Sequence, residues 1–479
     1  MIFNSFEFIF LFLPIAFIVY FILNKFHFTV SNVWLLLASL FFYSWWNPAY
    51  LPIILASLFV NFFISRYLGN EKNAYRKWAL TIGIALNVAL LGFFKYFDFL
   101  VTNINTIFLT NISLLHLLLP LAISFYTFQQ IAYLVDSYRL ETKHYTFINY
   151  SLFVTFFPQL IAGPIVQHNE VMDQFEDKNN RKLNLKNIAL GLFIFAIGMF
   201  KKVAIADQFA VFANNGYRMS ESLTFVDAWI TSLSYTVQLY FDFSGYSDMA
   251  IGLALLFNIR LPRNFNSPYK ALNIQDFWHR WHITLSKFLT KYIYIPLGGN
   301  RKGPIRTYIN ILLIFFISGI WHGAGWTFIL WGICHGLASV VNRYWIRAGF
   351  TMNKLLAWFI TFQFVNATWV LFRAPSLDVA GNVLKAMIGL NGIAIPQQLQ
   401  EVFNTNFGLP VYTHTLTESL LVTWLMLIIA LLIAVFAKNS LQLGEKLKPN
   451  FTNALFCSGL LIYTLFKIQQ VSEFLYFNF

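Results

Sequence analysis

The chain contains 479 residues, of which 58% are hydrophobic and 11% charged, and its mean hydropathy is +0.60. These values exclude a single water-soluble fold, because soluble domains carry about 25% charged residues and stop growing near roughly 250–300 residues. The net charge of +13 does not indicate nucleic-acid binding, because the basic residues lie mostly in short loops between apolar runs. We therefore predict a membrane protein whose basic side chains meet lipid headgroups and anionic substrates.

Apolar runs that suggest membrane-spanning helices recur along the whole chain. The first lacks the basic start and the small-residue cleavage site of a signal peptide, so we interpret it as a retained span. A spanning helix needs about 20 apolar residues and several runs are shorter, so we predict roughly eleven to thirteen transmembrane helices. The fold class is all-α and polytopic, with residues 1–479 as one membrane domain. The candidate runs are 6–23, 33–46, 51–65, 79–97, 114–134, 148–162, 188–200, 226–239, 249–259, 309–320, 327–341, 355–372, 420–437 and 451–466.

The distribution of lysine and arginine predicts the orientation in the membrane. Basic residues follow the first, third and fifth runs, whereas residues 101–113 and 391–419 contain none. Because basic loops stay in the cytoplasm, the N-terminus and the tail, residues 468–479, should both lie outside a bacterial inner membrane. Lys95 and Lys467 are exceptions, since each is a single basic residue at an outward end of a run.

The segment 260–306 differs from the rest because it holds nine basic residues and one acidic residue, Asp276. Apolar and aromatic side chains recur there at helical spacing, and Asn273 with Asp276 resembles a capping box. We predict an amphipathic helix over residues 274–292 at the cytoplasmic interface. The whole segment is then a cytoplasmic core motif of amphipathic or re-entrant structure.

Histidines form two groups that invite a functional interpretation. His279 and His282 lie three residues apart among tryptophans and share a helix face, which fits either a site or an interfacial aromatic belt. His322 follows an apolar run and precedes Gly323 and Gly325, which let the backbone break beside a costly polar residue. For His322 we favour a functional role over a simple hydrogen bond within a turn.

Other chemistries are less well supported. His335 lies in the next apolar run and is interpreted as a packed polar residue. His279, His282 and His322 could form a three-histidine metal site, but Asp276 is the only carboxylate that accompanies them, so no metal is expected. The sequence contains no G-x-S-x-G elbow, no P-loop and no dinucleotide-binding fingerprint.

Five motifs occupy the middle of the chain: FDFSGYSD (241–248), NFNSPY (264–269), DFWHRWHITLS (276–286), YIYIPLGGN (292–300) and WHGAGW (321–326). Together they resemble the membrane-bound O-acyltransferase (MBOAT) superfamily, in particular its bacterial branch that includes alginate O-acetyltransferases. The resemblance covers nearly the whole chain. It implies a ring of spanning helices around a central funnel that narrows at the catalytic residue.

The resemblance also implies roles for two histidines. His322 matches the histidine regarded as catalytic, and His282 matches the second functional position. An imidazole with an ordinary pKa near 6.5 can take the proton of an acceptor hydroxyl near neutral pH. We expect His322 to act as this base and His282 to stabilise or orient the developing oxyanion.

A cytoplasmic thioester, acetyl-CoA, is the donor that the resemblance implies, used as a substrate with no bound cofactor. Its phosphates suit arginine and lysine side chains. The donor-binding candidates are Arg280, Trp281, Arg301 and Lys302. The basic ones among them could instead only follow the positive-inside rule.

The tail sequence EFLYFNF, residues 473–479, resembles an aromatic C-terminal signature of this bacterial branch. By that resemblance Tyr476 could receive the acyl group at the outer face, while an interfacial aromatic anchor is an equally open alternative. The expected partners are a separate extracytoplasmic acetyltransferase of the SGNH type, a polysaccharide acceptor and membrane lipids.

The leading hypothesis is a membrane O-acyltransferase that moves acetyl groups across the membrane to a secreted or cell-wall polysaccharide. That acceptor could be alginate-like, peptidoglycan or another exopolysaccharide. The alternative is a transporter or flippase for a small or lipid-linked substrate, since transporters also use broken helices and mid-membrane polar residues. The sequence disfavours it because we find no inverted repeat and few carboxylates in the apolar runs. A scaffold in a polysaccharide synthase complex is a third possibility.

Overall fold

Helices account for nearly all the regular structure of the computed structural model, as the apolar runs predict. The structure describes every residue except 162, 404–409, 413–415, 418, 469–474 and 476–479. Within the described residues, β1 (Ile395–Pro396) and β2 (Val411–Tyr412) form one short parallel pair. The prediction of an all-α fold is confirmed.

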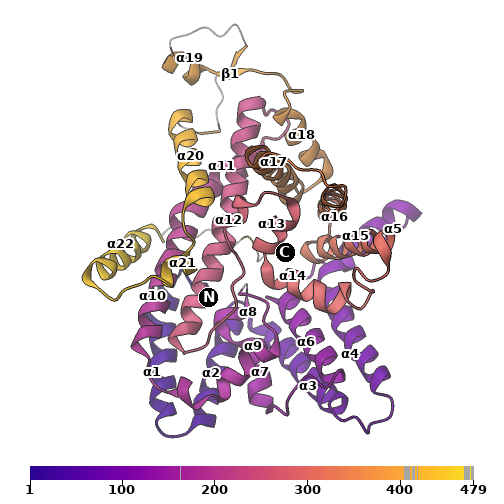
Figure 1. Ribbon diagram of the computed structural model, residues 1–479, viewed down its shortest axis with the longest axis vertical. Coiled ribbons are helices and arrows are strands. Elements are labelled where there is room, and N and C mark those ends of the chain that lie inside the picture. The colour runs from indigo at the N-terminus through magenta and orange to yellow at the C-terminus, as the bar shows by residue number, and fades with distance from the viewer. Residues whose placement is uncertain (162, 404–409, 413–415, 418, 469–474, 476–479) are drawn as a thin grey trace.

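The N-terminal helices gather at one end of the molecule, drawn in indigo and purple at the bottom of Figure 1. Three stretches here are long and apolar enough to cross a membrane: Glu7–Asn24, Pro48–Leu68 and Arg76–Phe108. The elements are a π-helical turn (Glu7–Phe12), α1 (Leu13–Asn24), α2 (Phe28–Ser44), a 3₁₀ turn (Pro48–Tyr50), α3 (Leu51–Leu68), α4 (Arg76–Leu91), a π-helical turn (Gly92–Tyr96), α5 (Phe97–Phe108), α6 (Ile123–Tyr138), α7 (Phe147–Thr155), α8 (Phe157–Leu160), α9 (His168–Glu176) and a 3₁₀ turn (Lys178–Arg181).

Two predicted spans in this part differ from the structure. The run 114–134 becomes helical only at Ile123, because its leucine-rich first part is a loop that is as apolar as a helix. The run 148–162 is divided into α7 and α8, with Pro158 in the first turn of α8. Proline suits a helix start and interrupts a continuing helix, which explains the division.

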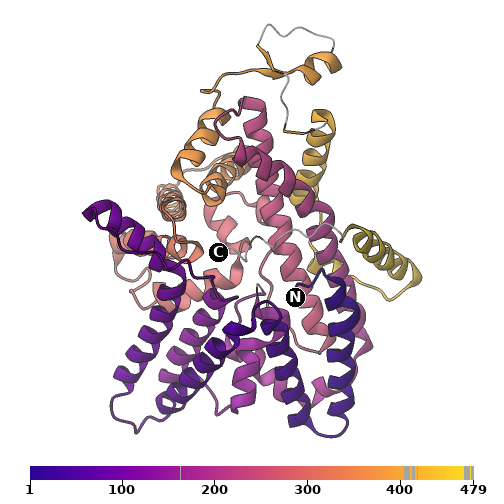
Figure 2. The same cartoon turned by 180° about the vertical axis from the view of Figure 1, so that it is seen from behind.

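A single long helix, α12 (Phe225–Leu256), passes through the centre of the molecule and is 32 residues long (Figures 1 and 2). The prediction of two spans, 226–239 and 249–259, is therefore wrong. Nearly all side chains of α12 are buried. At about 1.5 Å per residue the helix is roughly 48 Å long, more than the ~30 Å hydrocarbon core requires.

Buried ion pairs explain why the polar middle of α12 remains helical. Asp242 and Asp248 pair with Lys202 and Lys201, which belong to a π-helical turn packed beside α12. A buried charge is tolerated when it is paired, so polar residues that suggest a loop by hydropathy can lie inside the protein. The elements beside α12 are α10 (Leu185–Phe200), this π-helical turn (Lys201–Ala206) and α11 (Asp207–Arg218).

The predicted amphipathic helix 274–292 is also divided. α13 (Ile274–Arg280) and α14 (Ile283–Leu289) are separate, and a π-helical turn (Thr290–Tyr294) continues α14. The division occurs because His282 has a φ of 43°, which a right-handed helix cannot contain.

The structure also shows how α13 begins and which face of this segment is buried. The Asn273 side chain accepts a hydrogen bond from the backbone N–H of Asp276 at 2.8 Å, as the capping pattern predicts. The aromatic face is buried within the protein, with Phe277 and Trp281 in the core. The aromatic face of this segment therefore packs inside the protein, and its position at the cytoplasmic interface stays a prediction.

The C-terminal helices pack around α12 and α13 in the other half of the molecule (Figure 2). Across the described residues, six helical stretches are long and apolar enough to cross a membrane, and three shorter apolar helices accompany them. The number of crossings stays a prediction. The remaining elements are a 3₁₀ turn (Pro268–Lys270), α15 (Gly303–His322), α16 (Trp326–Arg347), α17 (Lys354–Arg373), α18 (Leu377–Met387), α19 (Gln397–Phe403), α20 (Leu420–Phe436), α21 (Ser440–Gly444) and α22 (Phe451–Lys467).

Candidate active site

His322 is the last residue of α15, at the predicted break in the helix. Gly323 and Gly325 then have extended backbones before α16 begins. A Cβ atom at Gly323 would lie 2.1 Å from the Phe328 ring, so this turn requires glycine for close approach. The glycine break therefore places His322 at a helix end packed tightly against α16.

The His322 side chain is 2% exposed and is surrounded by aromatic rings. Its ring centroid lies 4.8 Å from that of Trp321, 5.0 Å from that of Trp331 and 5.0 Å from that of Phe372. These rings come from α15, α16 and α17. The cage limits the rotation of the imidazole and keeps it away from bulk water.

His282, between α13 and α14, is completely buried. Its Nδ1 atom lies 3.0 Å from Oδ1 of Asn264, which also accepts from the Thr284 hydroxyl at 3.0 Å. Because Asn264 presents an acceptor, Nδ1 of His282 carries a proton. In the neutral ring the lone pair is then on Nε2.

Trp321 connects the two histidines predicted to be functional. Its ring centroid lies 6.0 Å from that of His282 and 4.8 Å from that of His322. The structure thus brings together residues 40 positions apart in the sequence, on the α13–α14 connection and at the end of α15.

His335 is a packed polar residue, as predicted. Its Nδ1 atom accepts from the Trp278 indole at 3.3 Å, and its Nε2 atom lies 3.0 Å from the Thr368 hydroxyl. His335 therefore fixes α13 against α16 and α17. Across the described residues, no group of three histidine, cysteine or acidic side chains could hold a metal ion.

Lys95 and Tyr96 contact the His322 turn, and the sequence analysis did not assign them to the site. The Lys95 ammonium donates to the carbonyl oxygens of Trp321 at 2.5 Å and His322 at 3.2 Å. The Tyr96 hydroxyl donates to the carbonyl of Ile320 at 2.6 Å. The available signal was the exceptional position of Lys95, a basic residue at an outward end of an apolar run.

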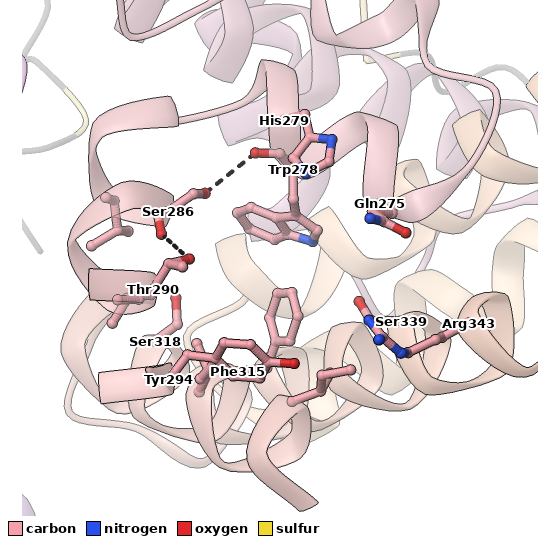
Figure 3. Close-up of a pocket in the computed structure, with 14 residues that line it drawn as sticks. Gln275, Trp278, His279, Ser286, Thr290, Tyr294, Phe315, Ser318, Ser339 and Arg343 are labelled. Atoms are coloured by element: carbon pink, nitrogen blue, oxygen red, sulfur yellow. Dashed lines mark hydrogen bonds between the residues drawn. The ribbon is translucent and has the colours of Figure 1, made fainter. Parts of the chain in front are cut away.

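A pocket of about 240 Å³ lies on one side of the histidines, between α13–α14 and α15–α16, and we call it the Trp278 pocket (Figure 3). Gln275 and Arg343 lie at one end of it, and Ser286 and Thr290 lie at the other. His279 lines this pocket, apart from the cage around His322. The full lining is Gln275, Trp278, His279, Leu285, Ser286, Leu289, Thr290, Tyr294, Ile311, Ile314, Phe315, Ser318, Ser339 and Arg343.

A second pocket of about 460 Å³ adjoins the first, since both are lined by Gln275 and Arg343. It adds Arg347, one helical turn along α16, and Asn300. The sequence analysis did not single out these arginines. Their spacing of four residues on a helix, which places both on one face, was the signal that could have identified them.

A third pocket, of about 320 Å³, lies against the residues that follow His322, and we call it the Lys95 pocket. Lys95, Gly323 and Ala324 line it together with Asp98 and Phe328. The Trp278 pocket is lined by Ser318, one turn earlier on α15. The His322 turn therefore lies between two pockets.

The predicted donor-binding residues lie outside the linings of these pockets. Arg280 pairs with Asp276 at 2.7 Å, and Trp281 packs in the core with its ring centroid 4.9 Å from that of Trp369. Arg301 and Lys302 are exposed in the connection before α15.

Tyr476 lies outside the described residues, but its neighbour Leu475 is placed. The backbone N–H of Leu475 donates to Oδ2 of Asp242 at 3.1 Å. The other Asp242 oxygen lies 2.6 Å from the Lys202 ammonium, which also pairs with Asp207 at 2.8 Å. Asp242 precedes Phe243, whose ring centroid is 4.9 Å from that of His282.

A separate cluster of charges ties the end of the α14 segment to α6 and α9. Asp136 accepts from the Tyr292 hydroxyl at 2.7 Å and pairs with Lys291 at 3.1 Å and His168 at 3.1 Å. Burial disfavours the carboxylate charge, but these bonds hold the pKa of Asp136 below its usual value. The cluster anchors the helix segment that forms one wall of the Trp278 pocket.

Comparison with known proteins decides the family. The family model described as MBOAT, membrane-bound O-acyltransferase family, matches residues 135–374, which include His282 and His322. A peptidoglycan O-acetyltransferase of Helicobacter pylori is 49% identical over 100% of this chain and 98% of its own length. The chain belongs to the membrane-bound O-acyltransferase family. It is accordingly a multi-pass membrane protein and an O-acyltransferase.

Other MBOAT relatives differ in their named substrates. A probable alginate O-acetylase AlgI of Pseudomonas aeruginosa is 40% identical over 87% of this chain and 80% of its own length. A teichoic acid D-alanyltransferase of Bacillus subtilis is 24% identical over 53% of this chain and 68% of its own length. The MBOAT family thus includes proteins named for acyl transfer to different cell-envelope polymers.

Proposed function

We propose that this MBOAT protein transfers an acetyl group from a cytoplasmic thioester to a secreted or cell-wall polysaccharide. The observation that carries the proposal is the pair of buried histidines, His282 and His322, packed against one tryptophan between two pockets. The relatives named for peptidoglycan and alginate acetylation support polysaccharide as the acceptor class.

In the proposed reaction His322 removes the proton of the acceptor hydroxyl. The oxygen attacks the thioester carbonyl, the new C–O bond forms, and the C–S bond breaks. The proton then passes from His322 to the departing sulfur, so the products are an ester and a free thiol. The aromatic cage around His322 excludes water that would otherwise hydrolyse the thioester.

The hydrogen bond between His282 and Asn264 bears on whether His282 stabilises an oxyanion or orients the reacting groups. A neutral His282 that donates from Nδ1 has only a lone pair at Nε2, so it can accept a hydrogen bond but cannot donate one to an oxyanion. We therefore assign His282 to orienting the acceptor hydroxyl or the catalytic imidazole. It would stabilise an oxyanion only as an imidazolium, which burial in an apolar cage disfavours.

The donor is proposed to be acetyl-CoA, held with its acyl end in the Trp278 pocket. Arg343 and Arg347 line the adjoining pocket and match the phosphates of this donor. Arg301 and Lys302 remain candidates for its outer phosphates, because they follow Asn300, which lines the same pocket.

Tyr476 is proposed to supply the hydroxyl that attacks the thioester, so the acyl group leaves the site as a tyrosyl ester. The bond from Leu475 to Asp242 supports this, since it brings the residue before Tyr476 close to the helix that contacts His282. At the outer face a separate acetyltransferase of the SGNH type would take the acetyl group from the tyrosyl ester and pass it to the polymer.

The proposed location is the bacterial inner membrane, with the N-terminus and tail outside. Basic loops predicted to be cytoplasmic meet at one end of the structure: Arg66 lies 3.1 Å from His144, and Arg76 donates to the Tyr138 carbonyl at 2.5 Å. This grouping supports a common cytoplasmic side for both loops.

The test is ester-linked acetate in wall and secreted polysaccharides of a deletion strain that carries wild type or variants. Wild type should restore acetylation, whereas His322→Ala and Tyr476→Phe should not, at equal membrane abundance by blot. His27→Ala, which changes an exposed histidine, is the matched control and should restore it. Arg343→Gln combined with Arg347→Gln should raise the KM for acetyl-CoA in purified protein.

Two outcomes would contradict the proposal. Full acetylation with His322→Ala would make the protein a conduit or scaffold. If deletion changed no polymer, the transporter or flippase hypothesis would take precedence.

A further inference from the structure

We propose that Lys95 is a positioning residue that fixes the His322 turn by holding the carbonyl end of α15. The inference rests on the proposed role of His322 as the base. In the structure the Lys95 ammonium donates to the carbonyl oxygens of Trp321 and His322, and to the hydroxyl of Ser124 at 3.3 Å.

Three consecutive carbonyls at the end of α15 are held by two consecutive residues of another helix. Tyr96 holds that of Ile320, and Lys95 holds those of Trp321 and His322. The last four carbonyls of a helix have no partner within the helix, so they need donors from elsewhere when they are buried. These bonds fix the peptide planes on both sides of the His322 side chain.

The backbone around Lys95 allows two adjacent side chains to reach one target. Residues Gly92–Tyr96 form a π-helical turn between α4 and α5, within a stretch otherwise suited to crossing the membrane. Neighbouring residues on a regular α-helix point about 100° apart, and π-helical turns change that direction, often at functional sites. Here the turn directs both donors at the end of α15.

The positive charge of Lys95 adds an interaction that an uncharged hydrogen-bond donor at this position would not make. A cation within a membrane-spanning segment is costly, so its presence needs a compensating interaction. The nearby carboxylate of Asp98 is occupied by the backbone N–H groups of Leu115 and His116, at 2.8 and 2.9 Å. The ammonium is instead directed at the negative end of the α15 dipole, where a positive charge is favourable.

Lys95 also lines the pocket that lies beside the His322 turn. Gly323 leaves no side chain with which this turn could anchor itself, and Lys95 lines the same pocket as Gly323 and Ala324. Without Lys95, of these three carbonyls at the end of α15 only that of Ile320 would keep its bond, the one from Tyr96. A displacement of about 1 Å at a catalytic group can lower the rate about 100-fold.

The experiment measures thiol release from acetyl-CoA by purified full-length protein in nanodiscs, with an extract of the deletion strain that supplies the separate acetyltransferase and the polysaccharide acceptor. Lys95→Met should lower kcat about 100-fold per folded molecule at an unchanged KM for acetyl-CoA. Lys95→Arg, which keeps a cationic donor, should recover activity to within about 10-fold of wild type. Lys467→Met removes the other outward lysine, which is exposed at the end of α22, and should match wild type.

The folded fraction is measured by size-exclusion chromatography, so a merely structural role is distinguishable. If Lys95→Met lost only folded protein, with kcat per folded molecule unchanged, the inference would be overturned. The same holds if Lys95→Arg were as inactive as Lys95→Met while folded. An active His322→Ala variant would overturn the proposed function and the inference with it. An inactive His322→Ala variant together with a fully active Lys95→Met variant would overturn the inference alone.

Discussion

Asn264 shows how a single side chain can decide the chemistry of a buried histidine. It accepts from Nδ1 of His282 and from both the backbone and the hydroxyl of Thr284. Because Thr284 donates to this oxygen, Asn264 offers Nδ1 of His282 an acceptor, and the fold favours the tautomer with the proton on Nδ1. The resemblance to the family pointed to His282, and it gave no indication of this partner 18 residues earlier.

The first prediction concerns this bond. Asn264→Ala should lower acetyl transfer about 10-fold or more, because the loss of one buried hydrogen-bond partner costs about 1–3 kcal/mol. The measurement is kcat for acetyl-CoA turnover by the purified variant. Thr284→Val, which removes the neighbouring donor and the acceptor of the Ile165 N–H, is the control and should have a smaller effect. Wild-type kcat in Asn264→Ala would show that the tautomer of His282 does not matter.

At the scale of helices, close approach of α10 and α12 shapes the centre of the protein. Gly191 faces Gly252, and Gly198 faces Gly245 one heptad away, so the two pairs lie seven residues apart on each helix. A Cβ on any of the four would lie 2.5–2.7 Å from a carbonyl oxygen of the opposite glycine. Small residues let helices in membranes pack with their backbones in contact.

The second prediction tests this packing. Gly252→Leu should separate α10 from α12 and destabilise the protein by about 1–3 kcal/mol, the usual cost of overpacking. It should lower the Tm of detergent-purified protein and weaken the pairing of α12 with the Lys201–Ala206 turn. Gly459→Leu changes a glycine of α22 with open space around it and should leave the Tm unchanged. Equal Tm values for both variants would contradict close packing at this crossing.

The whole molecule has two ends that are built from different parts of the chain. The N-terminal helices form one end and the region around β1 forms the other, as both views show (Figures 1 and 2). The proposed transfer across the membrane would need such an arrangement, because its donor and acceptor would approach from opposite sides.

The third prediction tests the orientation of these ends. In a background of Cys334→Ser and Cys457→Ser, Asn391→Cys should react with a membrane-impermeant maleimide on intact spheroplasts. Lys72→Cys should react only after the membrane is permeabilised. Both positions are exposed, so accessibility does not bias the comparison. The reverse labelling pattern would mean that the basic loops face outside.

The sequence by itself determined the membrane class, the all-α fold, the family resemblance and the break after His322. These features follow from local properties: hydropathy, glycine beside histidine, and short motifs. Hydropathy misplaced the boundaries of α6 and of the divided α7–α8 segment, and it divided α12, because it cannot distinguish an apolar loop from a helix or a buried ion pair from a polar loop.

The tertiary structure alone decided how the site is assembled. It joined Trp321 to His282 and placed Lys95 on the α15 carbonyls, 226 residues away in sequence. It also placed Arg343 and Arg347 in the lining of the second pocket, and Trp281 in the core. Such contacts depend on how distant helices pack, and no local pattern specifies the partner that a buried lysine or histidine will meet.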